Sequence, residues 1–353
     1  MSKGRYLYMR YLVGRNNLAV TVFVPYDCPN NCPFCTSKKD YANREGFSLD
    51  AILESLGEVL KFNAVRDVVI TGGEPFANLS ELTRILEFIH TFDMRNHVSH
   101  NVFINTTLPA KTPEKAKELF VYIRSCVSMG RITGLNVSRH IGFKTNLEYD
   151  KLIKQLCRSG VSLRINSVMT GEETKEEIED FIDRFDYVNQ INFRADYRRI
   201  ITQDDLRGYQ HPLLQKLFGI EDYEYSHSSG CHVCNTDTFK SINFYNYPVV
   251  CLHRGMEHSK VALVAGALEE VNDIIIKQDG RILFDWDEEG THDVVELIDS
   301  GWEARYNKRN DNRGFVGGSC GSGYYDDEDD EEEEHRSTGG SCGLGFGFGG
   351  GRC

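Results

Sequence analysis

Residues 18–35 read LAVTVFVPYDCPNNCPFC, and this stretch decides the fold. Its first seven residues are apolar except for Thr21 and are rich in β-branched side chains, which predicts a buried strand. The prolines and Asn30-Asn31 that follow favour a tight, non-helical loop in which side chains can converge. The stretch therefore predicts a strand with three thiols, those of Cys28, Cys32 and Cys35, just beyond its carboxyl end.

Short apolar runs and helical patterns alternate after this stretch. Each run is bounded by polar residues or glycine, and the runs cover residues 67–71, 102–105, 135–138, 161–168 and 190–194. The helical patterns include one after Ser48, one that opens with Thr112 and Pro113, and one that meets Gly160. Six strand–helix repeats predict parallel strands with right-handed crossovers. Because a closed barrel needs eight, we predict an α/β fold with a partial (β/α)6-type parallel barrel over residues 1–200.

The pattern changes after residue 200. Two hairpins are predicted, over residues 240–252 and over residues 274–284, where Asp279-Gly280 is a strong turn signal. Residues 293–307 are predicted to form a closing helix. We therefore expect a small C-terminal α+β metal-binding domain over residues 201–308. Residues 309–353 are rich in Gly, Ser and acids, and we expect a disordered tail there because such a composition buries too little apolar surface.

The charge of the chain is concentrated in that tail. The formal net charge is −13, and residues 326–334 are nine consecutive carboxylates, so the rest of the chain carries only −4. This argues against a general nucleic-acid-binding surface, which needs clustered Lys and Arg. No run approaches the roughly 18–20 apolar residues of a membrane helix, and residues 1–17 lack a secretory pattern. We expect a cytoplasmic protein without membrane contact, whose eleven cysteines are thiols or metal ligands.

The number of cysteines in the first loop is informative. Three thiolates spaced C-x3-C-x2-C can ligate three corners of a cubane iron–sulfur cluster. A structural zinc site normally closes with four ligands, whereas a cluster that binds a reactant needs one iron left open. The loop thus favours an iron–sulfur cluster on Cys28, Cys32 and Cys35, and the alternative is a zinc site with its fourth ligand elsewhere.

A second motif, Gly72-Gly73-Glu74-Pro75, follows the second predicted strand. Two glycines let the backbone approach a ligand closely, Pro75 stiffens the exit, and Glu74 can accept a hydrogen bond from an ammonium group. Ligands of parallel sheets bind at the carboxyl ends of the strands. Since the cysteine loop ends the preceding strand, we expect both motifs at the same edge of the sheet.

The two motifs, in this order, resemble the radical S-adenosylmethionine (SAM) superfamily, and an aromatic residue, Phe34, precedes the last cysteine. The resemblance covers about residues 18–195. It implies a [4Fe–4S] cluster on the three cysteines, with the SAM amino and carboxylate groups on the fourth iron. It implies that Gly72, Gly73 and Glu74 line the SAM amino group. It also implies reductive cleavage of SAM to a 5′-deoxyadenosyl radical that abstracts a hydrogen from the substrate.

Polar residues at the ends of later strands match the same family pattern. The resemblance implies SAM contacts for Asn105 and Thr106, and contacts to the SAM carboxylate or ribose for Ser138 and Arg139. Asn166 and the backbone near residue 192 are further candidates for ribose and adenine contacts. The alternative is that these are simply polar residues that end strands.

A second group of cysteines lies in the C-terminal region. Cys231 and Cys234 form a CxxC, and Cys251 follows after a gap of sixteen residues. The spacing resembles the auxiliary-cluster domain of the GTP cyclase of molybdenum-cofactor synthesis and of related radical SAM enzymes. His253 would instead complete a Cys3His zinc site. A second Fe–S cluster, a zinc ion and no metal all remain open here.

The resemblance leaves the substrate open. It implies a nucleotide or other small molecule, or alternatively a peptide or protein that the enzyme modifies, and an electron donor such as flavodoxin or ferredoxin. A different class of function is a non-catalytic, metal-binding interaction protein.

Overall fold

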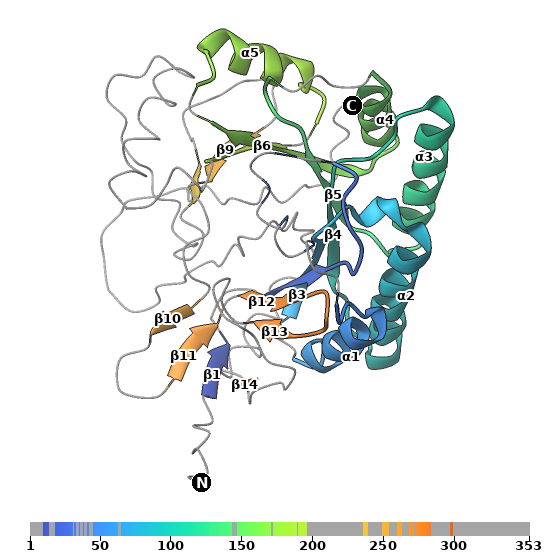
Figure 1. The fold of residues 1–353 in the computed structure, drawn as a ribbon, viewed down its shortest axis with the longest axis vertical. Helices are drawn as coiled ribbons and strands as arrows, with labels where there is room; N and C mark the ends of the chain where they lie inside the picture. The colour runs from blue at the N-terminus through green and yellow to red at the C-terminus, as the bar shows by residue number, and fades with distance from the viewer. Residues whose placement is uncertain are drawn as a thin grey trace, which may run out of the picture.

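The computed structural model describes residues 10–13, 18–30, 32, 35, 38, 41, 45–62, 65–142, 147–170, 172–188, 190–195, 236–238, 249–253, 260–262, 268–271, 273–283 and 297–298. Six of its strands are β2 (Leu18–Phe23), β3 (Val65–Thr71), β4 (Asn101–Thr106), β5 (Gly134–Ser138), β6 (Ser162–Met169) and β7 (Gln190–Ala195). They pair in parallel and in sequence order. The predicted partial barrel is confirmed, and Figure 1 shows the strands as a curved wall.

Five helices connect these strands and cover one face of the sheet (Figure 1): α1 (Leu49–Val59), α2 (Leu79–Asn96), α3 (Pro113–Ser128), α4 (Leu147–Arg158) and α5 (Lys175–Arg184). Their starts follow from local chemistry. The Ser48 side chain caps α1, and Thr112 caps α3 with Pro113 in its first turn, both as predicted. Thr174 and Glu177 form a reciprocal capping box at α5.

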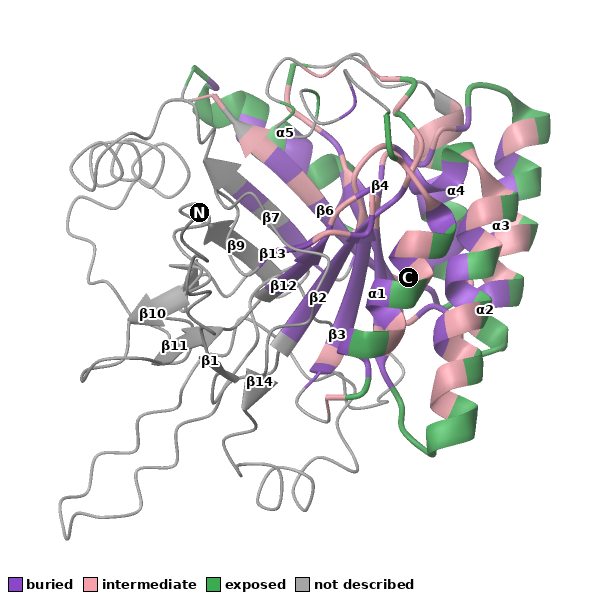
Figure 2. Cartoon of the chain, turned by 60° about the horizontal axis from the view of Figure 1, so that its bottom comes forward, coloured by how far each residue is buried: buried purple, intermediate pink, exposed green. Residues whose placement is uncertain are grey.

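The two faces of the sheet carry separate hydrophobic clusters. Alternate residues of β2, Val20 and Val22, belong to the large core shared with the helices, whereas Phe23 belongs to a second cluster with Ile275. Since side chains alternate along a strand, the second cluster lies on the face away from the helices. Figure 2 shows the buried strands at the centre with the buried stripes of the helices against them.

A row of polar residues crosses the sheet. The paired positions of neighbouring strands are Asn105 with Asn136, Asn136 with Arg164, and Arg164 with Gln190. The Arg164 Nε donates to Gln190 Oε1 at 2.8 Å, and both side chains are buried. Polar side chains on a buried face are stable only when hydrogen-bonded, so this row fixes the mutual register of the strands.

C-terminal strands extend the same sheet at both edges. At one edge β12 (Asp273–Ile276) pairs in parallel with β2 and carries β13 (Ile282–Leu283), which confirms the predicted hairpin. At the other edge β9 (Val249–His253) pairs in parallel with β7 and carries β8 (Thr236–Thr238). The predicted division at residue 200 stays a prediction, and strands from both sides of it share one sheet. Residues 309–353 lie outside the described residues.

A smaller sheet has the order β10 (Lys260–Ala262), β11 (Leu268–Val271), β1 (Arg10–Val13) and β14 (Leu297–Ile298). Residues 297 and 298 were predicted as helical, and this is wrong, because they pair with β1. Among the helices that the structure describes, none has both the length and the apolar character that crossing a membrane requires.

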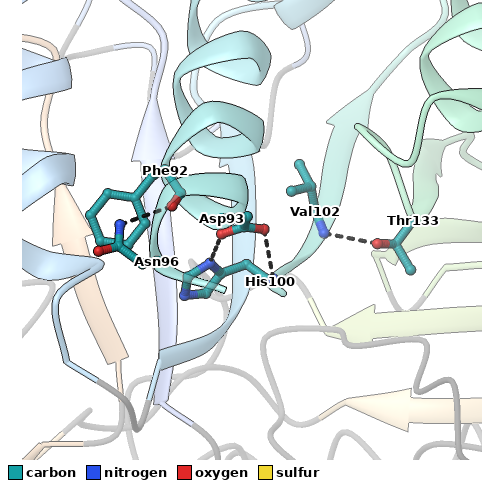
Figure 3. Close-up of polar contacts among 6 residues, drawn as sticks. All are labelled: Phe92, Asp93, Asn96, His100, Val102 and Thr133. Carbon is teal, nitrogen blue, oxygen red and sulfur yellow. Dashed lines mark hydrogen bonds and ion pairs between the residues drawn. The ribbon is translucent and has the colours of Figure 1, made fainter. Parts of the chain in front are cut away.

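The amino end of β4 is fastened to α2 by one carboxylate (Figure 3). Asp93 accepts from the His100 backbone N–H at 2.9 Å and contacts the His100 ring Nδ1 at 2.5 Å. Beside it, Thr133 Oγ1 accepts the backbone N–H of Val102 at 2.9 Å. These contacts lie at the end of the strand opposite the two sequence motifs.

Candidate active site

The cysteine loop follows β2 directly. Cys28 and Cys32 are half-buried, Cys35 is exposed, and all three are free thiols. The backbone N–H of Cys28 donates to Asp27 Oδ1 at 2.6 Å, and that of Asn30 donates to the Cys28 sulfur at 3.4 Å. Burial raises the pKa of Cys28 to about 11 and raises the pKa of Cys32 as well. Because metal ligands must be thiolates, metal binding at this loop releases protons.

Gly72 and Gly73 follow β3 and pack directly on that loop. A Cβ on Gly73 would lie 2.1 Å from the Tyr26 carbonyl oxygen, and one on Gly72 would lie 2.2 Å from the Tyr41 hydroxyl. Gly72 also has a φ of +105°, which L side chains rarely adopt. The two motifs therefore touch backbone to backbone, as their positions at one edge of the sheet predicted.

Two tyrosines tie the motifs together. Tyr41 receives a hydrogen bond from the Gly73 backbone N–H at 2.7 Å and donates to the Val24 carbonyl at 2.8 Å. Tyr26 donates to the Pro75 carbonyl at 2.7 Å. The sequence analysis missed both tyrosines. Only the closeness of Tyr26 to the first cysteine was a signal for either of them.

Glu74 is 1% exposed and its carboxylate is fully engaged. Oε1 accepts from Thr106 Oγ1 at 2.6 Å and from the Phe76 N–H at 3.1 Å. Oε2 accepts from both the N–H and the hydroxyl of Thr107, at 2.7 and 2.5 Å. Burial raises the pKa of Glu74, and these hydrogen bonds oppose that shift. Four donors fill the four lone-pair sites of a carboxylate, so this side chain joins the ends of β3 and β4.

Asn105, which precedes Thr106 on β4, and Asn136, its paired residue on β5, lie beside this network. Asn105 Nδ2 donates to Thr71 Oγ1 at 3.2 Å, and Asn136 Nδ2 donates to Asn105 Oδ1 at 2.8 Å. Asn136 is 4% exposed, and its own Oδ1 has no hydrogen-bond partner among the described residues. The predicted residue Asn105 is thus oriented by a neighbour, Asn136, that the sequence analysis did not single out, although it lies within a predicted strand.

Arg139 follows β5 and is 7% exposed. One of its terminal nitrogens, Nη1, donates to the carbonyls of Thr107 and Ser138, at 2.7 and 2.6 Å, and its guanidinium lies 5.0 Å from the centre of the Tyr149 ring. Its Nε and Nη2 are buried without a hydrogen-bond partner in the described part of the chain. Burial lowers the pKa of Arg139 to about 10. Two unsatisfied donors on a buried cation suit a carboxylate, which accepts such pairs in a bidentate manner.

Of the remaining predicted residues, some lie in the described part of the chain and others do not. Ser138 pairs with Asn166 across β5 and β6, and the Asn166 carbonyl accepts the Arg139 backbone N–H at 3.0 Å. In the second cysteine group, Cys251 lies on β9 opposite residue 192 of β7, while Cys231 and Cys234 lie outside the described residues. The structure thus brings the first cysteine group next to the Gly72–Pro75 segment. Thr107 links the same loop to Arg139, because it accepts hydrogen bonds from both Asn30 and Arg139.

The three thiols of the first group do not converge as ligands of a single ion. Among the residues that the structure describes, no three Cys, His, Asp or Glu side chains are gathered to hold one metal ion. A cubane cluster has a different requirement, because each cysteine binds a different iron. The three free thiols of this loop are the residues that could hold such a cluster.

Comparisons with known proteins agree with this geometry. Residues 22–185 match the family described as "Radical SAM superfamily". No curated protein sequence matches the chain significantly. Among solved structures, "Native anSMEcpe with bound AdoMet and Cp18Cys peptide" is 13% identical with a TM-score of 0.44, and the match covers 82% of each chain.

Two further solved structures show similarity at the same level. "Native anSMEcpe with bound AdoMet" is 14% identical with a TM-score of 0.39, and the match covers 56% of this chain but only 59% of that one. The coproporphyrinogen III oxidase HemN from Escherichia coli, described as a radical SAM enzyme, is 15% identical with a TM-score of 0.35, over 51% and 44% of the two chains. The sequence match is the decisive comparison: residues 22–185 of this chain form a domain of the radical SAM superfamily.

Proposed function

We propose that Cys28, Cys32 and Cys35 hold a [4Fe–4S] cluster and that SAM binds its fourth iron through its amino and carboxylate groups. The observation that carries this proposal is the backbone contact between Gly73 and the loop at Tyr26. Because of it, a ligand that meets the glycines also meets the cluster loop. When bound, the cluster supplies the electron that cleaves SAM to methionine and a 5′-deoxyadenosyl radical, which abstracts a hydrogen from the substrate.

The residues around the loop have distinct roles in this proposal. Arg139 binds the SAM carboxylate through its unsatisfied Nε and Nη2 donors. Gly72 and Gly73 let the segment that lines the amino group pack directly on Tyr26 and Tyr41, while Glu74, whose lone pairs are taken, orients that segment. The polar edge against which the nucleoside part of SAM lies is formed by Asn105, Thr106, Ser138 and Asn166.

Anaerobic reconstitution tests directly whether the chain cleaves SAM. The chain is loaded with iron and sulfide, reduced with dithionite and supplied with SAM, and 5′-deoxyadenosine is measured. We expect production that the C32A variant lacks, whereas the C126A variant, at a buried cysteine of α3, should retain it. No 5′-deoxyadenosine above the C32A background would defeat the proposal and favour a non-catalytic metal-binding protein.

We also propose a second metal centre on Cys231, Cys234 and Cys251, with an auxiliary Fe–S cluster preferred to a zinc ion completed by His253. Its support is the CxxC spacing together with the pairing of β9 to β7, which brings Cys251 into the barrel sheet. Metal analysis separates the options. About eight irons per chain indicate two [4Fe–4S] clusters, and about four irons with one zinc indicate a zinc site.

For the substrate we propose a nucleotide or other small molecule, with flavodoxin or ferredoxin as the electron donor. The support for this substrate class is the spacing of the second cysteine group. The alternative proposal is a peptide or protein substrate. The reconstituted enzyme should be offered pools of nucleotides and of peptides. The pool that raises 5′-deoxyadenosine above the uncoupled level identifies the class.

A further inference from the structure

One residue of the cysteine loop connects a cluster ligand to the carboxyl ends of two strands. The backbone N–H of Asn30 donates to the Cys28 sulfur at 3.4 Å, within the longer range of hydrogen bonds to sulfur. Its side-chain Nδ2 donates to Thr107 Oγ1 at 2.8 Å, across 77 positions of sequence. Asn30 is therefore held through both its backbone N–H and its side-chain amide.

The donor and acceptor roles in this connection follow from the hydrogens and lone pairs that its groups carry. A hydroxyl has one hydrogen and two lone pairs. Thr107 gives its hydrogen to Glu74 Oε2 at 2.5 Å, which turns a lone pair toward the Asn30 amide. Thr107 is itself anchored because its backbone N–H donates to the same oxygen at 2.7 Å. The buried Glu74 carboxylate thus orients Thr107, Thr107 orients Asn30, and Asn30 directs its N–H at the Cys28 sulfur. We call these three residues the Asn30–Thr107–Glu74 relay.

We propose that the Asn30–Thr107–Glu74 relay positions the Asn30 N–H on the Cys28 sulfur of the bound cluster and thereby stabilises the reduced cluster. The proposal rests on the proposed ligation of a cluster by Cys28, Cys32 and Cys35. A reduced cluster carries one more negative charge, spread over iron and sulfur, and a hydrogen-bond donor at a ligand sulfur favours that state. Hydrogen bonds to the sulfurs are among the factors that set cluster potentials. Asn30 is thus a positioning residue for electron uptake.

The test compares two substitutions at one site. T107V removes the hydroxyl while keeping the shape and the backbone N–H, and T107S keeps the hydroxyl. A matched control is T133V, since Thr133 Oγ1 also accepts one hydrogen bond, from the Val102 N–H, at the opposite end of the sheet (Figure 3). Each variant is reconstituted, its iron is counted, and the reduced fraction is measured by electron paramagnetic resonance at a series of fixed potentials without SAM.

We expect T107V to retain its cluster and to show a tenfold lower ratio of reduced to oxidised cluster at a given potential, which is about 59 mV for a one-electron couple. T107S and T133V should match the wild-type chain. N30A, which removes the side-chain tether but keeps the N–H, should shift the ratio in the same direction. The double variant N30A/T107V should add little to either single change, because both break one connection.

Three results would overturn the proposal. One is a wild-type ratio in both T107V and N30A, and another is an equal shift in T133V. The third is loss of iron from N30A, which would mean that Asn30 assembles the loop and does not tune its potential. These outcomes differ from a failure of the proposed cluster, which would appear first as a wild-type chain whose bound iron does not depend on Cys28, Cys32 and Cys35. If T107V fails to fold, N30A decides alone.

Discussion

Replacing Gly73 with alanine should slow the cleavage of SAM strongly while it lowers the stability of the chain only moderately. The added Cβ would lie 2.1 Å from the Tyr26 carbonyl oxygen and 2.8 Å from the Asp27 carbonyl carbon. Close carbon–oxygen contacts lie at about 3.3 Å, so the loop has to move by roughly 1.2 Å. Rotation of a side chain cannot relieve the contact, because both of these neighbours are backbone atoms.

The two consequences of that movement have different sizes. Overpacking of this kind costs about 1–3 kcal/mol of unfolding free energy, which a chain with a large core survives. A misplacement of about 1 Å between reacting groups costs about 10²-fold in rate. We therefore expect G73A to fold, and to form 5′-deoxyadenosine about 100-fold more slowly than the wild-type chain at saturating SAM.

Urea denaturation and a single-turnover assay of 5′-deoxyadenosine measure the two effects separately. The matched control is G57A within α1, where the new Cβ would meet only the tip of the Phe88 ring, at 3.1 Å. Alanine is favoured over glycine in a helix by about 1 kcal/mol, which offsets this contact, so G57A should keep the wild-type rate. A G73A variant that cleaves SAM at the wild-type rate would refute the argument that this backbone contact sets the geometry of the site.

Individual side chains give three other predictions. R139L should weaken SAM binding by about 10- to 100-fold, the value of a charge-assisted hydrogen bond or two, as measured by equilibrium dialysis; wild-type affinity would remove Arg139 from the site. H100A should lower the unfolding free energy by about 1–3 kcal/mol because it leaves Asp93 short of a partner, with SAM cleavage unchanged. Burial raises the pKa of Asp67 to about 6, from about 3.9 in the unfolded chain. The folded state then binds more protons, so Asp67 destabilises the fold increasingly as the pH rises from about 4 to about 6. The stability of D67N relative to the wild-type chain should therefore increase by about 2 kcal/mol over that window, and urea denaturation at several pH values that showed a constant difference would contradict this.

Most of the barrel could be predicted because its signals are local. The strands are short apolar runs of fixed period, and the caps at Ser48 and Thr112 act within one helical turn. The C-terminal strands were harder. The turn at Asp279-Gly280 predicts a hairpin, but nothing in that segment states that β12 pairs with β2, near the other end of the chain. The helix predicted over residues 293–307 was wrong at 297–298 because pairing with β1 overrides a weak local preference.

The candidate site divides in the same way. The cysteine spacing and Gly72-Gly73 are local, and they alone indicated the resemblance to the radical SAM superfamily, the edge of the sheet at which the two motifs meet and the three candidate cluster ligands. The tertiary structure decided how these parts are held. Tyr41, Thr107 and Asn136 meet the motifs only because neighbouring strands adopt one register, and a register depends on contacts between residues far apart in sequence. The same contacts make Glu74 a brace between two strand ends, because hydrogen bonds from Thr106 and Thr107 occupy lone pairs of its carboxylate. Its expected position beside the SAM amino group stays a prediction.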